Sequence, residues 1–143
     1  MSSEPGPYDD FVMDHIRNAR NFRVLEHVNR ESSGTNPPCG DRLTVQLRVA
    51  RGRVEEAAFQ CECCGISMAT ASMMTDWVKG RTLAEARQFV REFAGRLAGR
   101  AGGVVDGAGE MERALLATAR QFPARVRCAA LPWSTLESML DEN

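Results

Sequence analysis

The chain has 143 residues, of which 43% are hydrophobic and 26% charged, so we expect one globular domain, residues 1–143, around a single core. It contains no run of about eighteen apolar residues, which excludes a membrane-spanning helix and gives no reason to expect a membrane partner. The net charge is −1, and without a basic patch there is no electrostatic case for binding nucleic acid.

The first part of the chain predicts one helix followed by irregular chain. Pro7 suits the first turn of a helix, and apolar side chains then recur on one face at Tyr8, Phe11, Val12 and Ile16. We therefore expect a helix from about Tyr8 to Ala19, with residues 1–7 as a flexible N-terminus. Residues 24–30 favour a short strand. The turn-forming residues of 31–38 predict a loop that leads to Cys39-Gly40-Asp41.

Two strands are expected next. Apolar and polar residues alternate strictly from Arg42 to Val49, as in a half-buried strand. Arg51-Gly52 predicts a tight hairpin turn, after which residues 53–60 return as the partner strand. Because Val54 and Phe59 fall on opposite parities of that strand, we expect a β-bulge between them.

The second half of the chain predicts helices. Small and apolar residues after Cys64 indicate a buried helix that stops at Lys79-Gly80, and Thr82 with Glu85 forms a capping box for the next helix. Gly99 to Gly109 contains five glycines and predicts a loop.

We expect two further helices after this loop. One begins near Met111 and is broken by Pro123. The last carries Leu136, with Pro132 tolerated only in its first turn. The fold class is therefore α+β: an N-terminal helix, an antiparallel sheet of about three strands and a C-terminal helical half.

Three of the five cysteines, Cys61, Cys63 and Cys64, lie where a strand meets a helix. The N-terminus of a helix favours thiolate over thiol. The N-terminal residues do not resemble a secretory signal, so we expect a cytoplasmic protein with reduced thiols. The odd number of cysteines argues against a disulfide framework and for metal binding or thiol catalysis.

Three interpretations of the cysteines remain open from the residues alone. A C-x-x-C pair, Cys61 with Cys64, favours a dithiol oxidoreductase, although the expected antiparallel hairpin does not match the βαβ setting of that motif. A four-ligand site can be completed by Cys39, Asp41 and Cys128, an acceptable set for zinc or iron. Alternatively, Cys39 and Cys128 are small buried hydrophobic residues.

Several segments, in order along nearly the whole chain, resemble the IscU/NifU family of iron–sulfur cluster assembly proteins. The segments are Y-x-x-x-V-M-D-H-x-x-N-x-R-N (Tyr8 to Asn21), N-P-P-C-G-D (Asn36 to Asp41), C-G-I-S-M-A-T-A-S-M-M-T (Cys64 to Thr75), V-K-G (Val78 to Gly80) and F-P-A-R-V-R-C-A (Phe122 to Ala129). The Gly-rich insertion after Leu97, and Arg127 where the IscU branch has a metal-binding histidine, resemble the SufU-like branch.

This resemblance implies a SufE/NifU-like fold and a role in iron–sulfur cluster biogenesis. It implies a metal held by Cys39, Asp41, Cys64 and Cys128, with zinc in SufU-like proteins and iron or a [2Fe–2S] cluster in IscU-like ones. The implied partners are a SufS-type cysteine desulfurase and downstream assembly proteins. Whether the chain is a sulfurtransferase-type acceptor or a non-enzymatic scaffold stays open. For an acceptor, Cys39 on its Pro/Gly-rich loop is the expected nucleophile, with Cys128 as the second candidate.

The chain departs from the family at Cys61 and Cys63, where the family has glycines. They are either small substitutes for glycine or extra thiols beside the metal, for cluster ligation or sulfur relay. We expect neither to ligate zinc, and at least one to lie close enough to the site to capture sulfur or to oxidise against Cys64 or a neighbouring cysteine. His15 and His27 are not expected to ligate metal, and His15 is interpreted as structural.

Overall fold

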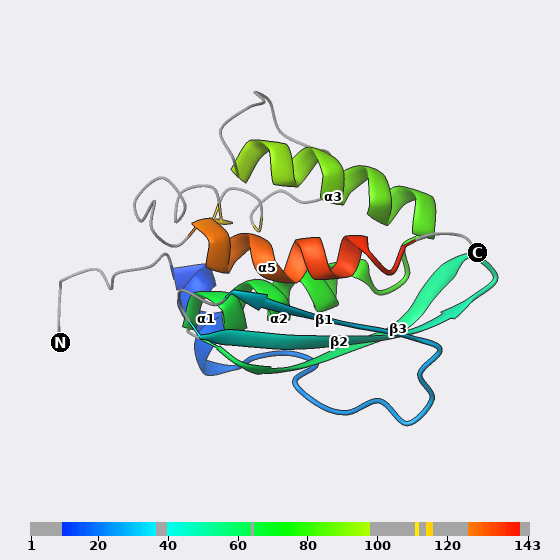
Figure 1. Cartoon of the computed structure of the whole chain (residues 1–143), viewed down its shortest axis with the longest axis horizontal. Coiled ribbons are helices and arrows are strands. Elements are labelled where there is room, and N and C mark those ends of the chain that lie inside the picture. The colour runs from blue at the N-terminus through cyan, green and yellow to red at the C-terminus, as the bar shows by residue number, and fades with distance from the viewer. Residues whose placement is uncertain are drawn as a thin grey trace, which may run out of the picture.

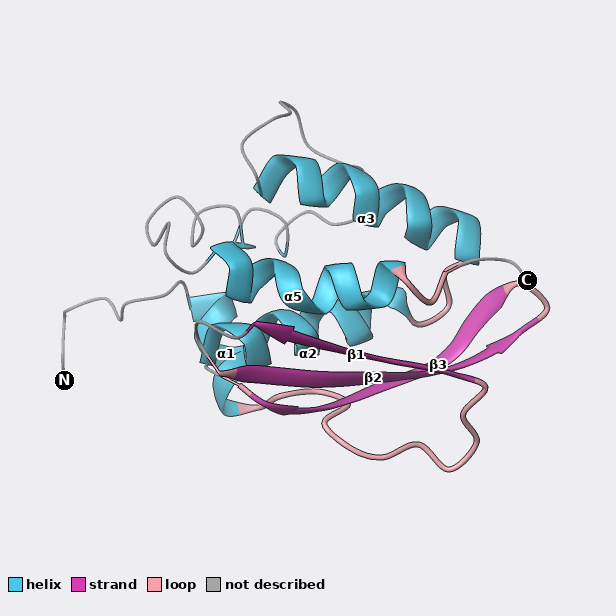
Figure 2. Ribbon diagram, in the orientation of Figure 1, coloured by secondary structure: helices cyan, strands magenta, loops and turns pink. Residues whose placement is uncertain are grey.

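The computed structural model describes residues 10–36, 40–63, 65–97, 111, 114–115 and 126–140. In chain order its elements are α1 (Asp10–Arg17), β1 (Arg30–Asn36), β2 (Asp41–Ala50), β3 (Arg53–Glu62), α2 (Gly65–Val78), α3 (Leu83–Leu97) and α5 (Val126–Glu137). The strands form an antiparallel sheet in the order β1-β2-β3 (Figure 2). The predicted α+β class is therefore confirmed. The expected N-terminal segment, the Gly-rich loop and the break at Pro123 fall outside the described residues.

Helices cover one face of the sheet. α2 and α5 lie side by side against it, α1 packs on α2, and α3 lies on α5 away from the strands (Figure 1). The core between these layers is made of fully buried side chains, among them Leu47, Phe59, Met74, Trp133 and Leu136. None of the described helices is long and apolar enough to cross a membrane.

The β2–β3 hairpin has the turn and the bulge that the sequence predicts. Arg51 and Gly52 both have positive φ, 55° and 72°, which is the backbone of a two-residue hairpin turn. The pairing shifts between Arg48 and Val49, because Arg48 pairs with Glu56 and Val49 with Val54. The extra residue, Glu55, changes the phase of β3, so that Val54 and Phe59 are both fully buried.

Strand β1 corrects the prediction for this region. The expected strand at 24–30 is wrong, and so is the loop expected at 31–38 as far as residue 36, because Arg30–Asn36 pairs along β2. Its polar residues are satisfied at the edge of the sheet: the hydroxyl of Ser33 bonds Thr44 at 2.9 Å and that of Ser32 bonds Ser138 at 2.9 Å. These turn-forming residues adopt a strand conformation because β2, a separate segment of the chain, supplies their backbone hydrogen-bond partners.

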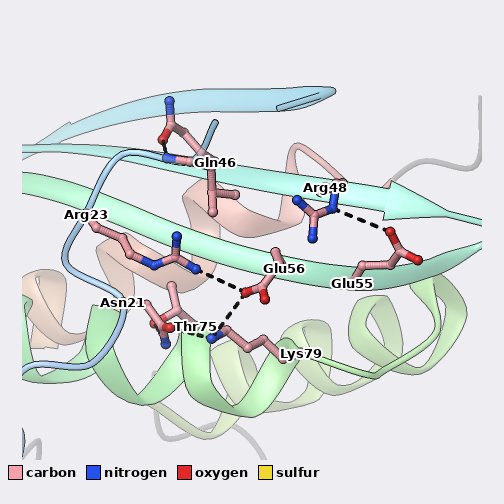
Figure 3. Close-up of polar contacts among 9 residues, drawn as sticks. Asn21, Arg23, Gln46, Arg48, Glu55, Glu56, Thr75 and Lys79 are labelled. Atoms are coloured by element: carbon pink, nitrogen blue, oxygen red, sulfur yellow. Dashed lines mark hydrogen bonds and ion pairs between the residues drawn. The ribbon is translucent and has the colours of Figure 1, made fainter. Parts of the chain in front are cut away.

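The free edge of β3 is covered by two loop segments. The segment after α1 bridges it, with the Phe59 N–H donating to the Asn21 carbonyl at 2.9 Å. The segment after α2 covers the other end, with the Val54 N–H donating to the Arg81 carbonyl at 2.9 Å. Figure 3 shows side chains of both segments meeting between α2 and β3, where Lys79 contacts Asn21 and Glu56. Covered edges prevent pairing with other chains.

The end of α2 and the start of α3 agree with the sequence-based prediction, whereas the position of Pro132 in α5 does not. Gly80 has a φ of 83° after α2, and α3 begins with the predicted capping box, in which the Glu85 N–H donates to Thr82 Oγ1 at 3.1 Å and the Thr82 N–H donates to Glu85 at 3.3 Å. Pro132, however, lies inside α5 rather than in its first turn. The prediction for Pro132 is therefore wrong, and the reason lies in the candidate site.

Candidate metal and sulfur-transfer site

Two of the four predicted ligands lie together in the described part of the chain. Asp41 opens β2 and Cys128 lies in the first turn of α5, and their exposed fractions are 2% and 0%. Ser67 of α2 connects them, because its Oγ is 3.0 Å from Oδ2 of Asp41 and 3.2 Å from the Cys128 carbonyl oxygen. We call these three residues, contributed by three different elements, the Asp41–Ser67–Cys128 junction.

The position of Pro132 explains why Ser67 bonds a carbonyl that belongs to a helix. In an α-helix the N–H of residue i donates to the carbonyl of residue i−4, and for Cys128 that donor position is Pro132. Proline has no N–H, so the Ser67 hydroxyl supplies a hydrogen bond that α5 itself does not. A proline inside the helix is tolerated here because another helix provides the missing donor.

Ser67 was not identified as a site residue from the sequence. It lies three residues after Cys64 in the sequence, and serine is not one of the usual zinc ligands. The sequence contains one indication: Pro132 follows Cys128 by four residues, so in a helix the Cys128 carbonyl has no N–H donor from its own helix. The sequence does not show which hydroxyl fills that need.

The other two predicted ligands, Cys39 and Cys64, lie outside the described residues. Within the described part of the chain no group of three or more His, Cys, Asp or Glu residues is arranged to hold a metal ion. The donors that are described suit zinc, which accepts carboxylate oxygen and thiolate sulfur in tetrahedral sites. A buried carboxylate and a buried thiol on adjoining elements are therefore compatible with the predicted set.

Cys61 and Cys63 are joined by a disulfide. This corrects the expectation that the thiols are all reduced. The expected oxidation of an extra thiol against a neighbour occurs between these two cysteines, whose Cα atoms are 5.5 Å apart, and not in the Cys61–Cys64 pair of the dithiol hypothesis. Cys61 lies in β3 and Cys63 directly after its end, and the short step between them brings the two sulfurs together.

The structural interpretation of His15 is confirmed. The ring is 4% exposed, and its Nδ1 lies 2.6 Å from the hydroxyl of Ser72 on α2. That hydroxyl also accepts the backbone N–H of Arg20 at 2.7 Å. Burial, with a smaller contribution from the positive charge of Arg20, lowers the pKa of His15. His27 is exposed and lies in the segment before β1.

Comparison with known proteins identifies the family. Residues 7–129 match the model of the NifU-like N-terminal domain. The chain belongs to this family. The resemblance seen in the sequence is thus confirmed over most of the chain.

Two relatives and one solved structure extend the match. The chain is 37% identical over 130 residues to the zinc-dependent sulfurtransferase SufU of Bacillus subtilis, covering 91% of this chain and 86% of that protein. It is 32% identical over 133 residues to the iron–sulfur cluster assembly scaffold protein IscU of Streptococcus pyogenes, covering 93% and 82%. The crystal structure of a SUF-system scaffold protein from Fervidobacterium islandicum has a TM-score of 0.84 at 24% identity, covering 94% and 97%, and shows the same fold.

Proposed function

We propose that this NifU-like domain is a zinc-bound sulfur acceptor in iron–sulfur cluster biogenesis. It takes persulfide sulfur from a SufS-type cysteine desulfurase and passes it to downstream assembly proteins. The observation that carries the proposal is the match to a zinc-dependent sulfurtransferase along 91% of the chain. The Asp41–Ser67–Cys128 junction supports it, because the Ser67 hydroxyl connects the carboxylate of Asp41 to the backbone of Cys128, and both residues are buried.

The proposed ligands are Cys39, Asp41, Cys64 and Cys128. Bound zinc keeps cysteine ligands deprotonated and so supplies thiolates at neutral pH. Asp41 is the one oxygen donor in a set of sulfur donors, and Ser67 holds its carboxylate in place through Oδ2.

We assign the acceptor role to Cys39. Cys128 is fully buried in α5, so a partner's persulfide cannot reach its sulfur without opening the helix. Cys39 directly precedes Gly40 in the sequence, and Gly40 is exposed, has a φ of 71° and leads into β2. The Cys39 thiolate attacks the outer sulfur of the desulfurase persulfide, a new S–S bond forms on Cys39, and the desulfurase cysteine leaves as a thiolate.

The test is the release of alanine by the desulfurase in the presence of the purified chain. We expect Cys39→Ala to reduce the stimulation at least tenfold, whereas Cys61→Gly and Cys63→Gly, which restore the family's glycines, retain most of it. Full stimulation by Cys39→Ala would move the acceptor role to Cys64 or Cys128. No stimulation by the wild-type chain would refute the proposed function.

A second candidate function is a scaffold on which a [2Fe–2S] cluster is assembled and transferred. The match to a scaffold protein along 93% of the chain favours it. Metal analysis and a visible spectrum after anaerobic purification distinguish the two functions. Zinc without visible absorbance supports the acceptor, and iron with acid-labile sulfide supports the scaffold.

Zinc binding has its own expected outcome. Because metal binding to a folded site adds to the free energy of folding, a chelator should lower the melting temperature of the zinc-loaded chain. The Asp41→Ala variant, which lacks the oxygen donor, should respond less to the chelator. Equal melting temperatures with and without metal would argue against a bound ion.

A further inference from the structure

The Cys61–Cys63 disulfide lies beside the candidate site without belonging to the proposed ligand set. In the β2–β3 ladder Leu43 pairs with Cys61 and Arg42 with Glu62. β3 ends at Glu62, so Cys63 directly follows the last pair of this ladder.

The face of the sheet agrees with this placement. Side chains of a strand alternate between the two faces, and cross-strand partners point the same way, so Cys61 shares the face of Leu43, which is 2% exposed. Asp41 lies two residues before Leu43 and is buried as well. The Sγ of Cys61 is 4.0 Å from Sδ of Met68, the residue that follows Ser67 on α2. The disulfide therefore adjoins the Asp41–Ser67–Cys128 junction.

The disulfide contributes little as a cross-link. The stabilisation that a disulfide provides grows with the length of the loop that it closes, and this one encloses only Glu62. Glu62 is already held in β3 by its pairing with Arg42. Two cysteines at a position where they do not reinforce the fold suggest a chemical role.

The two cysteines are also accessible to a reactant. Both are half-buried, and Glu62 between them is exposed. Exposed disulfides are the ones that exchange readily with thiols. A small persulfide, or a persulfide carried by another cysteine, can therefore approach this pair from solvent.

We propose that Cys61 and Cys63 form a redox couple that reduces sulfane sulfur to sulfide at this site. The inference rests on the proposed function, which supplies a persulfide. The Cys61 or Cys63 thiolate attacks the inner sulfur of the persulfide, the outer sulfur leaves as hydrosulfide, and a mixed disulfide forms. The second thiol of the pair then displaces the carrier thiol, which leaves Cys61 and Cys63 joined.

The electrons balance in this sequence. A sulfane sulfur needs two electrons to become sulfide, and the conversion of two thiols to one disulfide provides two. The described structure corresponds to the oxidised couple. A dithiol reductant, a small molecule or a protein, returns the couple to the reduced state for the next sulfur.

The experiment uses the full-length, zinc-loaded chain, reduced, freed of reductant, and mixed with glutathione persulfide as the sulfur donor. The sulfide released is measured, and the pairing of Cys61 with Cys63 is followed by alkylation and mass spectrometry. From the two-electron balance we expect about one sulfide per wild-type chain, with Cys61 and Cys63 protected from alkylation. Cys61→Ser and Cys63→Ser should each stop at the mixed disulfide, with one glutathione retained on the remaining cysteine, because the second exchange needs the missing thiol. The double variant, which lacks both thiols, should release less than about a tenth of the wild-type sulfide.

Glu62→Gln is the matched control, since it changes the residue between the cysteines, keeps both thiols and should behave as wild type. Melting temperatures exclude unfolding, and a fold defect at the half-buried Cys61 would not recur identically at Cys63. Equal sulfide release from wild type and from the double serine variant, or release that leaves Cys61 and Cys63 of the wild type open to alkylation, overturns the proposal.

The outcome is separable from that of the proposed function. Glutathione persulfide replaces the desulfurase as donor, so the couple is tested even if the chain does not stimulate a desulfurase. Conversely, Cys61→Ser and Cys63→Ser should still stimulate alanine release. Stimulation without sulfide formation from glutathione persulfide would leave the acceptor in place and refute the couple.

Discussion

Ser67 has no metal-binding chemistry of its own, yet its hydroxyl joins two candidate ligands that are 87 positions apart in the chain, Asp41 and Cys128. A hydroxyl has one hydrogen, and here it lies between a carboxylate and a carbonyl. The residue is 1% exposed, so water does not readily replace it. Ser67 therefore positions both groups, and its loss should affect stability as well as metal affinity.

We expect Ser67→Ala to lower the free energy of unfolding by about 1–3 kcal/mol, the cost of leaving a buried polar group without its partner. Ser134→Ala is the control, because Ser134 is exposed and its Oγ bonds only to the Leu131 carbonyl of its own helix. Urea unfolding measures both. Pro132→Ala restores an N–H for the Cys128 carbonyl, so Ser67→Ala should cost less in that background. An equal cost in both backgrounds would contradict the role assigned to Pro132.

Asn21 shows how a single residue anchors the segment after α1. Its φ is 64°, a conformation that asparagine tolerates better than most residues. Its side-chain amide donates to Thr75 Oγ1 at 3.1 Å (Figure 3). Its backbone carbonyl accepts the Phe59 N–H at 2.9 Å. The residue thus connects the segment after α1 to α2 and β3 at once.

We expect both Asn21→Gly and Asn21→Ala to destabilise the fold, with alanine the worse by about 1 kcal/mol. Glycine keeps the positive φ and loses only the side-chain bonds, whereas alanine loses both. Thermal unfolding of the two variants measures the difference. Equal melting temperatures would show that the backbone conformation carries none of the effect.

At the scale of the elements, a glycine in β1 allows this strand to pack closely against α5. A Cβ on Gly34 would lie 2.3 Å from Thr135 Oγ1 and 3.0 Å from Leu131 Cδ1. Gly34 pairs with Leu43 in the ladder. The spacing between β1 and α5 therefore depends on the absence of a side chain, and so does the position of the helix that carries Cys128.

Gly34→Ala should lower the free energy of unfolding by about 1–3 kcal/mol, because the added methyl group overpacks the interface. Thr135→Ala removes the nearest clashing atom, so the double variant should recover part of the loss. Chemical denaturation of the two single variants and the double variant gives the coupling. Strictly additive effects would mean that the strain is relieved elsewhere.

At the scale of the whole molecule, α1 is held against α2 by buried polar contacts around His15. The Ser72 hydroxyl, which accepts from the Arg20 N–H, can donate to Nδ1 of the neutral His15 ring. Burial is the largest influence on His15 and lowers the pKa of its ring, and the positive charge of Arg20 lowers it further. The negative charges of Asp14 and Asp76 raise the pKa, but by less than burial lowers it. Protonation of the ring therefore opposes the folded state.

The sign of the pH dependence follows. The folded pKa of His15 lies below the ordinary value of 6.5, so the unfolded chain binds a proton more readily, and stability falls as the pH drops through and below 6.5. Wild type should lose more stability between pH 7.5 and 5.5 than His15→Asn, whose amide oxygen can replace Nδ1 as an acceptor. The lowered pKa values of Asp14 and Glu85, each held down by hydrogen bonds, affect stability only at more acidic pH. Parallel pH profiles would exclude His15 as the cause.

The sequence by itself determined the features that depend on neighbouring residues. The alternation in β2, the turn at Arg51-Gly52, the bulge and the capping box at Thr82 all follow from local backbone and side-chain preferences. The same holds for the stop at Gly80. The family resemblance and the list of candidate ligands were also readable from the order and spacing of residues.

Only the tertiary structure decided the features whose partners are distant in the chain. Residues 30–36 form a strand because β2 supplies the backbone partners and Gly34 admits α5. Pro132 is accepted inside a helix because Ser67, on another helix, bonds the carbonyl that proline cannot. The residues next to each segment do not reveal these partners, since hydrogen bonds between distant segments form only when the fold brings the segments together.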